Sequence, residues 1–285
     1  MYAESNYSSV HVLHVIPGGD SVSGVTSLGD NVFVLRDDLD TQKIEVYDAK
    51  NFTLQRHITV PGLDDDDSFI NSLAACPHNN CLYASEWNWD NVHRVELSGN
   101  NAVMKFSVAR RPVGLSVNSE HNLLVVSQAA MNLQIFTTRG TLLQNIQLQP
   151  NICCPMRAVQ LPTGQFMVNN CVLFWSGLCL VGADGAVVRR YGGRQGSQVT
   201  QINQLEGLAV DREGRVLVAD WWNNRLLVID QSLSSAHEMS VGVDGGLNQP
   251  DSLWYDQSRR RLYIGEWVGG RVIVIGSLKD FQLRT

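Results

Sequence analysis

One position of a recurring segment is polar or charged in most of its copies. The residues at this position are Ser23, Asn71, Val113, Arg157, Glu206 and Asp251. Asn71, Glu206 and Asp251 carry hard oxygen atoms, which are the ligands that Ca²⁺ prefers in proteins. Arg157 differs, because its guanidinium would repel a metal ion or pair with Glu206 or Asp251. The set therefore predicts either a structural polar ring with Arg157 in an ion pair, or a divalent-cation site formed by Asn71, Glu206 and Asp251.

The tryptophans form a second candidate site. Six of the seven fall in or beside short links that follow the second strand of a copy, namely Trp87, Trp89, Trp175, Trp221, Trp222 and Trp267. Exposed aromatic clusters bind sugars, peptides, cations or bases through stacking and apolar area. The alternative is that individual tryptophans pack between neighbouring copies. We expect these six residues, together with Arg157, to bind a ligand.

Acidic residues immediately precede three of these tryptophans, at Glu86, Asp220 and Glu266. An acidic and aromatic surface would suit a polyol or a cation. However, Asp220 and Glu266 are each followed five residues later by an arginine, across a tight link. An ion pair within the copy would explain both acids without any ligand.

These residues recur because the chain contains six copies of one strand-rich segment. The clearest copy, residues 203–230, reads as three runs rich in valine, leucine and isoleucine that are separated by short turns. Successive copies lie 48, 42, 44, 49 and 45 residues apart. A period in the forties with about four strands per copy is typical of propeller blades. We predict an all-β, six-bladed β-propeller of four-stranded antiparallel blades, with blades that begin near residues 23, 71, 113, 157, 206 and 251.

The last copy lacks a fourth strand, and the segment at about residues 9–17 belongs to no copy. If this segment pairs with the last blade, the ring closes and its unpaired edges disappear. Residues 1–285 are then expected to form a single domain. In a propeller the first strand of each blade lines the central channel, and its start lies on the same face as the link after the second strand. The polar position and the tryptophans should therefore share one face.

The copy at residues 203–229 resembles the NHL repeat through GLAVD (207–211), GRVLVAD (214–220) and NNR (223–225). RLYIGEW (261–267) and GGRVIVI (269–275) fit the same pattern. The chain is thus similar to the six-bladed propellers that end tripartite-motif ubiquitin ligases. The RING, B-box and coiled coil of those ligases are not in this sequence. The resemblance implies a fold and an interaction module, and it carries no ligase activity.

We predict a non-enzymatic binding module without a cofactor, whose tryptophan-rich face recognises a protein segment or a carbohydrate. The first alternative is a hydrolase, because the polar position is also similar to the channel mouth of calcium-dependent lactonases and related phosphotriesterases on six-bladed propellers. That resemblance implies that Glu206, Asn71 and Asp251 would hold a catalytic Ca²⁺. The sequence around these residues is not close to that family.

The second alternative is single-stranded RNA binding, which some NHL propellers perform on a basic face with aromatic residues. Arg110–Arg111 and Arg259–Arg261 would supply the positive charge. The formal net charge of −6 and the acids beside the tryptophans work against phosphate binding.

The chain has no apolar run near the roughly 18–20 residues that cross a bilayer, so we expect a soluble monomer with no membrane span. The six cysteines leave the compartment open. Buried thiols would favour the cytoplasm, whereas disulfides Cys76–Cys81 and Cys171–Cys179 would favour secretion. No Cys-x-x-Cys pair or His/Cys cluster has the spacing of a zinc site.

Overall fold

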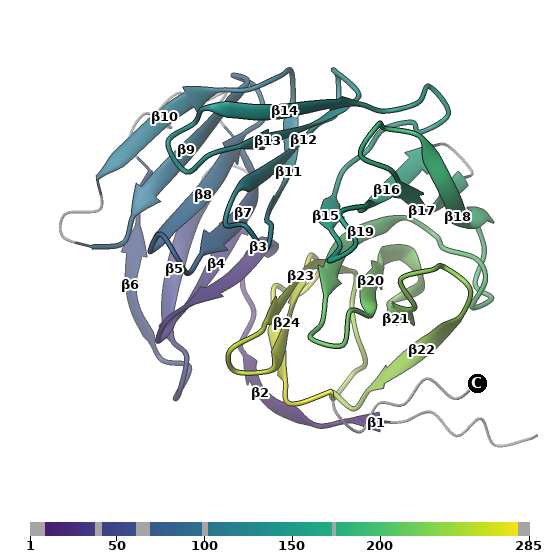
Figure 1. Ribbon diagram of the computed structural model, residues 1–285. Coiled ribbons are helices and arrows are strands. Elements are labelled where there is room, and N and C mark those ends of the chain that lie inside the picture. The colour runs from purple at the N-terminus through teal and green to yellow at the C-terminus, as the bar shows by residue number, and fades with distance from the viewer. Residues whose placement is uncertain (1–8, 38–41, 61–68, 99–101, 173–174, 279–285) are drawn as a thin grey trace, which may run out of the picture.

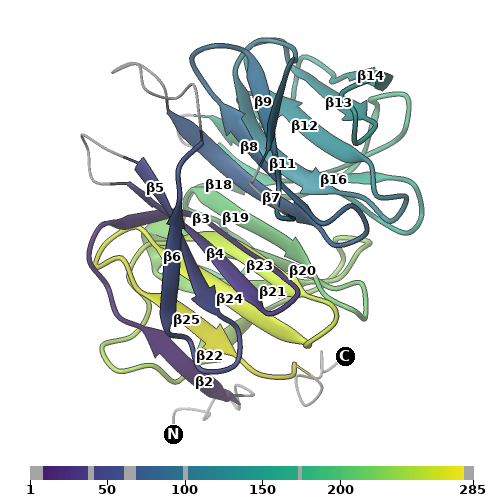
Figure 2. The same ribbon diagram turned by 90° about the vertical axis from the view of Figure 1, so that its left-hand side faces the viewer.

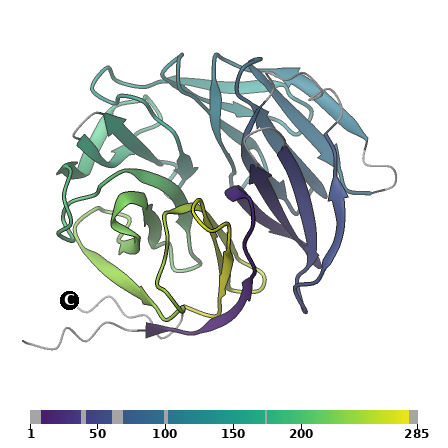
Figure 3. The same cartoon turned by 180° about the vertical axis from the view of Figure 1, so that it is seen from behind.

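The computed structural model describes residues 9–37, 42–60, 69–98, 102–172 and 175–278. These residues form six antiparallel sheets arranged as the blades of a ring (Figures 1 and 3). Blades 1 to 3 contain, in chain order, β3 (Ser21–Leu28), β4 (Asn31–Asp37), β5 (Gln42–Asp48), β6 (Leu54–Ile58), β7 (Ile70–Cys76), β8 (Cys81–Glu86), β9 (Asn91–Glu96), β10 (Val103–Ser107), β11 (Pro112–Val117), β12 (Leu123–Ser127), β13 (Asn132–Phe136) and β14 (Leu142–Gln147).

Blades 4 to 6 complete the ring. They contain β15 (Ala158–Gln160), β16 (Phe166–Val172), β17 (Trp175–Val181), β18 (Val187–Arg194), β19 (Leu205–Val210), β20 (Val216–Asp220), β21 (Arg225–Ile229), β22 (Ala236–Val241), β23 (Pro250–Asp256), β24 (Arg261–Glu266) and β25 (Val272–Ile275). The first strand of each blade contacts the first strand of the next, and β23 returns to β3. The first strands therefore surround the central axis, and the predicted fold class is confirmed.

The N-terminal segment closes the ring. Strand β2 (Val12–Ile16) pairs antiparallel with β25 and supplies the fourth strand of blade 6, as the sequence predicted. Strand β1 (Ser9–Val10) pairs in parallel with β22 at the outer edge of blade 5, which the sequence did not indicate. The segment thus joins the outer edges of two blades, and β2 runs along the outside of β25 (Figure 2).

The hydrophobic core is divided among the spaces between neighbouring blades. Each of six buried clusters joins two adjacent blades, and one of them joins blades 6 and 1 through residues such as Val25, Tyr263 and Val274. Strands in the middle of a blade are covered on both faces, so β8, β12 and β20 are buried along their whole length. This is why their sequences read as continuous apolar runs and not as a strict alternation.

The strand register tests the two cysteine pairs. Cys76 and Cys81 lie directly opposite each other on β7 and β8. On the next candidate hairpin, Cys179 lies opposite Val168, and Cys171 lies opposite Ser176. Cys171 and Cys179 are therefore offset by three residues, which is roughly 10 Å along the strands. A Cys171–Cys179 disulfide, one of the two pairings that would have favoured secretion, does not fit this register, because the sulfur atoms could not bridge the offset without backbone movement.

No helix in the described part of the chain is long and apolar enough to cross a membrane.

Candidate functional site

The links between second and third strands are held to the start of the first strand by a repeated backbone hydrogen bond. The N–H of Trp87 donates to the carbonyl of Phe69 at 3.0 Å, and that of Trp221 donates to Gln204 at 2.9 Å. Trp267 makes the same bond to Gln249 at 2.9 Å. Each acceptor lies two residues before the polar position of its blade. The tryptophan links and the six polar positions, which we call the axial ring, therefore lie on one face of the propeller.

Buried ion pairs fix two of these links. The fully buried Asp220 accepts a hydrogen bond from the N–H of Asn203 at 2.7 Å and from Arg225 Nε at 2.8 Å. The other guanidinium nitrogens of Arg225 donate to the carbonyls of the loop that enters blade 5, at Ser197, Gln198 and Gln201. The pair thus ties the link to the incoming loop.

Blade 6 repeats this arrangement with a longer acid. Glu266 accepts from the N–H of Asn248 at 2.8 Å and from Arg271 Nε at 2.6 Å, and Arg271 donates to the carbonyls of Asp244 and Gly246. The predicted ion pairs within blades 5 and 6 are therefore present. Asp220 and Glu266 are both fully buried, so they add no charge to an acidic and aromatic surface.

Glu86 stabilises the blade 2 link with different partners. Its Oε2 lies 3.0 Å from His93 Nε2 and 3.0 Å from Lys105 Nζ. Burial, the largest influence, raises the pKa of Glu86, but the hydrogen bonds from His93 and Lys105 together outweigh it and lower the pKa. Since Glu86 is also buried, none of the three acids beside the tryptophans reaches the surface.

The tryptophans divide into packed and exposed residues. Trp87, Trp221 and Trp267 are half-buried, and Trp87 packs against the core between blades 3 and 4. Trp89 and Trp222 are 52% and 54% exposed. The backbone of Trp175 begins β17, and its side chain lies outside the described part of the structure. The two alternatives predicted for the tryptophans, exposure on one face and packing between neighbouring blades, therefore apply to different residues.

Gln204 connects the exposed Trp222 to the axial ring. Trp222 Nε1 donates to Gln204 Oε1 at 2.7 Å, and Gln204 Nε2 donates to Glu206 Oε1 at 2.7 Å. Trp221 packs edge-on against Trp222, with ring centroids 4.4 Å apart. Gln204 was not predicted from the sequence. This residue lies two positions before Glu206 of the axial ring, and its backbone carbonyl accepts the hydrogen bond from the Trp221 link. A long amide there, beside a pair of tryptophans, is the signal that could have indicated it.

Arg157 spans the axial ring toward blades 2 and 3. Its guanidinium donates to the carbonyl of Val113, and it lies 3.4 Å from both Asn71 Oδ1 and the Asn71 carbonyl. Among the ion pairs of the described residues, none joins Arg157 to Glu206 or Asp251. The predicted ion pair is therefore wrong, because backbone and amide oxygens on the opposite side satisfy the guanidinium.

Glu206 and Asp251 face the axis from neighbouring blades 5 and 6. Burial, the largest cause, and the Glu206 carboxylate raise the pKa of Asp251 to about 8, and the charge of Arg157 offsets this only in part. Burial also raises the pKa of Glu206, against a hydrogen bond from Gln204 and the charge of Arg157. The pair therefore favours a bound proton at neutral pH.

This raised pKa predicts a pH-dependent stability. Between about pH 4 and 8 the folded state holds a proton on Asp251 that the unfolded chain has released. The free energy of unfolding should then fall as pH rises through this range, by at most about 1.4 kcal/mol per pH unit for one proton. Asp251→Asn should flatten the dependence and be more stable than wild type at pH 8.

Urea denaturation from pH 5 to 8 in the presence of a chelator would measure the effect. The exposed Glu120→Gln is the control and should follow wild type. Parallel curves for wild type and Asp251→Asn would contradict the prediction.

A divalent cation fits the axial ring poorly. The Asn71 Oδ1 that would bind it faces the Arg157 guanidinium at 3.4 Å. The residues present therefore do not fit a catalytic metal held by Glu206, Asp251 and Asn71.

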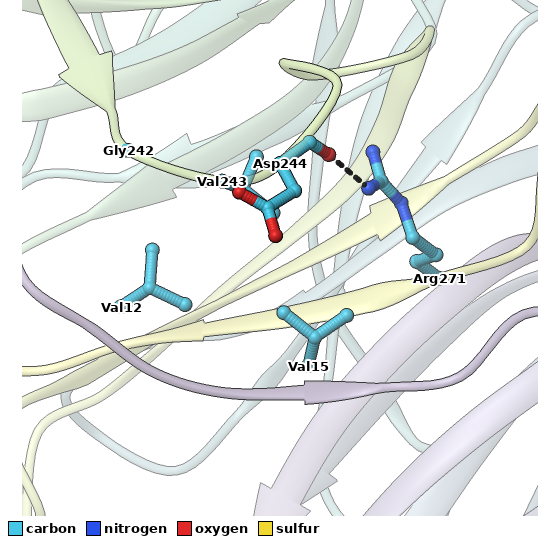
Figure 4. Close-up of a pocket in the computed structure, with 6 residues that line it drawn as sticks. All are labelled: Val12, Val15, Gly242, Val243, Asp244 and Arg271. Atoms are coloured by element: carbon cyan, nitrogen blue, oxygen red, sulfur yellow. Dashed lines mark hydrogen bonds between the residues drawn. The ribbon is translucent and has the colours of Figure 1, made fainter.

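A small pocket lies at the rim, away from the axial ring. Val12 and Val15 point from β2 toward residues 242–244, and Arg271 forms one wall by donating to the Asp244 carbonyl at 2.9 Å (Figure 4). Arg271 is also bound to Glu266, so the pocket wall belongs to the ion pair that fixes the blade 6 link.

The structure thus defines a six-bladed β-propeller whose links carry aromatic residues around a polar axial ring. Residues 203–229 match the NHL repeat. No curated protein matches the chain at a significant level of sequence similarity.

Several solved structures share the fold. A protein of unknown function from Bacteroides thetaiotaomicron has a TM-score of 0.71 at 14% identity, over 94% of this chain and 72% of that chain. Hydrazine synthase from Kuenenia stuttgartiensis has a TM-score of 0.65 at 15% identity, over 99% and 82%. Virginiamycin B lyase from Staphylococcus aureus has a TM-score of 0.64 at 8% identity, over 92% and 98%. At these identities the likeness concerns the fold alone, and the resemblance to tripartite-motif proteins stays a prediction.

Proposed function

We propose that this protein is a non-enzymatic binding module that takes an extended protein segment across the tryptophan-bearing face. The observation that carries the proposal is the position of the two exposed tryptophans, Trp89 and Trp222. Trp89 belongs to blade 2 and Trp222 to blade 5, which are three blades apart in a ring of six. A single ligand that contacts both tryptophans must therefore cross the axial ring.

The axial ring suits a polar main chain that lies over it. Arg157 reaches toward blades 2 and 3, whereas Glu206 and Asp251 occupy blades 5 and 6. A crossing segment would meet a cationic half and an acidic half, in addition to an aromatic ring at each end. Aromatic residues at interfaces supply large contact area with a small loss of side-chain entropy. A monosaccharide would reach only one of the two tryptophans, so an extended peptide uses more of this surface.

The fold does not exclude an enzyme, because propellers serve many unrelated functions. Two of the structures that share the fold are named as a lyase and a synthase. The binding proposal is supported by the site itself, where Trp89 and Trp222 are exposed and the buried acids Asp220 and Glu266 are used to fix the links.

Alanine substitution of each exposed tryptophan should weaken ligand binding. A random-peptide display library and a glycan array, both probed with the full chain, would supply ligands. For a selected peptide, Trp89→Ala and Trp222→Ala should each raise Kd about tenfold or more, as expected for aromatic anchors. Because the two residues lie three blades apart, the effects should be additive in free energy.

Val188→Ala on the outer strand β18 is the matched control. Val188 is 58% exposed, so its removal should leave Kd unchanged. Selected peptides that bind equally well to both tryptophan variants would contradict the proposal. If a glycan binds wild type and only Trp222→Ala loses affinity for it, the ligand would be a carbohydrate and not a protein segment.

A further inference from the structure

We propose that Cys76 and Cys81 are a redox pair that forms a reversible disulfide across the β7–β8 hairpin. Cys76 is the last residue of β7 and Cys81 is the first of β8, and the two are directly opposite in the strand register. Directly opposed residues on antiparallel strands have Cα atoms roughly 4.5–5.5 Å apart. This separation lies within the range of about 4.4–6.8 Å that disulfides require. The bond can therefore form without rearrangement of the blade.

The surroundings of the sulfur atoms favour exchange chemistry. Asn79, within the turn, donates from Nδ2 to Cys76 Sγ at 3.1 Å. Tyr83 and Arg94 lie opposite each other on β8 and β9, on the same face as Cys81. The hydrogen bond from Cys81 is the largest cause that lowers the pKa of Cys76, and the bond from Asn79 acts in the same direction, whereas burial opposes both. The same contact with Cys76, together with burial, raises the pKa of Cys81, and the Tyr83 hydroxyl and the positive charge of Arg94 both act to lower it.

The oxidant would be a low-molecular-weight disulfide such as oxidised glutathione. The Cys76 thiolate attacks one sulfur of that disulfide, which forms a mixed disulfide and releases one glutathione thiolate. That thiolate takes the Cys81 proton, and the Cys81 sulfur then attacks Cys76 Sγ and releases the second glutathione. The protein loses two hydrogen atoms and two molecules of glutathione are reduced.

Burial determines when this exchange can take place. Both cysteines are fully buried in the core between blades 2 and 3. An external disulfide can reach Cys76 only when the hairpin opens or before blade 3 packs against it. The Cys76 thiol also lies 3.9 Å from the carbonyl of His121 in blade 3, so opening of the hairpin would loosen this interblade contact. We expect the disulfide to form slowly in the native protein and faster under conditions that partly unfold it.

The disulfide lies on the face opposite the proposed binding surface. The β7–β8 turn joins first and second strands, whereas the tryptophans lie on links between second and third strands. Oxidation should therefore change stability without changing the tryptophan-bearing face, which makes this inference independent of the proposed function.

The full chain would be equilibrated in glutathione buffers of increasing oxidised fraction, then acid-quenched, alkylated in denaturant and mapped by mass spectrometry. The expected result is a peptide that links Cys76 to Cys81, while Cys179 stays alkylated. The oxidised protein should melt a few degrees higher than the reduced protein, because a cross-link restricts the unfolded chain.

Two variants control this experiment. Cys81→Ala should abolish the cross-link and the melting difference, whereas Cys179→Ala should retain both. If Cys81→Ala does not fold, the presence or absence of the Cys76–Cys81 linked peptide in wild type still tests the proposal. Full alkylation of Cys76 and Cys81 at every buffer ratio, or a cross-link from Cys76 to another cysteine, would overturn the proposal.

Discussion

Arg225→Met is expected to lower the free energy of unfolding by about 3–5 kcal/mol, because it leaves a buried charge without its partner. Asp220 is fully buried, and Arg225 Nε contacts its carboxylate at 2.8 Å. The substitution also leaves the carbonyls of Ser197, Gln198 and Gln201 without their donors. Methionine keeps most of the side-chain volume, so the loss would report on charge and hydrogen bonds and not on a cavity.

Chemical denaturation followed by tryptophan fluorescence would measure this loss. Lys50→Met is the control, since the Lys50–Asp30 pair is largely exposed and should contribute no more than about 1 kcal/mol. Arg225→Lys should give an intermediate loss, because an ammonium keeps the charge but cannot bind the acid and three carbonyls together. Equal stability of Arg225→Met and Lys50→Met would contradict the prediction.

The local ion pairs could be predicted because both partners belong to the same link. Asp220 and Arg225 are directly opposite in the register of β20 and β21, so a spacing of five residues across a short link is enough to place them together. The closing strand could be predicted for a similar reason, since a missing fourth strand and a spare N-terminal segment leave one pairing that removes the edges.

The partners of Arg157 could not be predicted in this way. Its contact with Asn71 joins residues 86 positions apart in the sequence. The repeat register places the Cα of Arg157 on the axial ring, but the direction of a long flexible side chain depends on which oxygen atoms neighbouring blades offer. The backbone carbonyl of Val113, which takes one of its hydrogen bonds, has no signal in the sequence.

The exposure of individual tryptophans also depends on local backbone geometry. Trp221 and Trp222 begin a short 3₁₀ turn that ends at Asn224 in the left-handed conformation, with φ of 52°. Asp90 ends the blade 2 link with φ of 54°. Asparagine and aspartate tolerate this conformation better than most residues. The turn directs one tryptophan inward and its neighbour outward, and their positions in the sequence alone do not say which.

In blade 1 an arginine takes the position that a buried acid holds in blades 5 and 6, and this arginine helps to close the ring. Its residue at the position of Asp220 and Glu266 is Arg36, which is buried and contacts Glu45 at 2.8 Å. Arg36 also donates to the carbonyls of Asp20, at 3.2 Å, and of Gly270 in blade 6. One guanidinium thus joins the last link of the chain to the first blade.

Arg36→Met should therefore lower the free energy of unfolding by about 3–5 kcal/mol and loosen the contact between blades 6 and 1. Burial, the largest influence, raises the pKa of Glu45, but bonds from Arg36 and Tyr47 outweigh it and lower the pKa. Wild type should lose this contribution as pH falls through the lowered pKa, and the variant should not. Chemical denaturation at pH 7 and in steps from pH 5 down to about pH 3, which lies below the ordinary carboxyl pKa of about 4.3, would measure both effects.

The control for Arg36 acts on the same acid. Lys43 Nζ lies 3.8 Å from Glu45, but its side chain is 41% exposed, so Lys43→Met should cost no more than about 1 kcal/mol. Amide hydrogen exchange should rise in β2 and β3 of Arg36→Met and stay unchanged in β12, which lies on the far side of the ring. A uniform rise in amide exchange in all blades would mean that Arg36 stabilises the propeller as a whole. That result would contradict a specific role of Arg36 in ring closure.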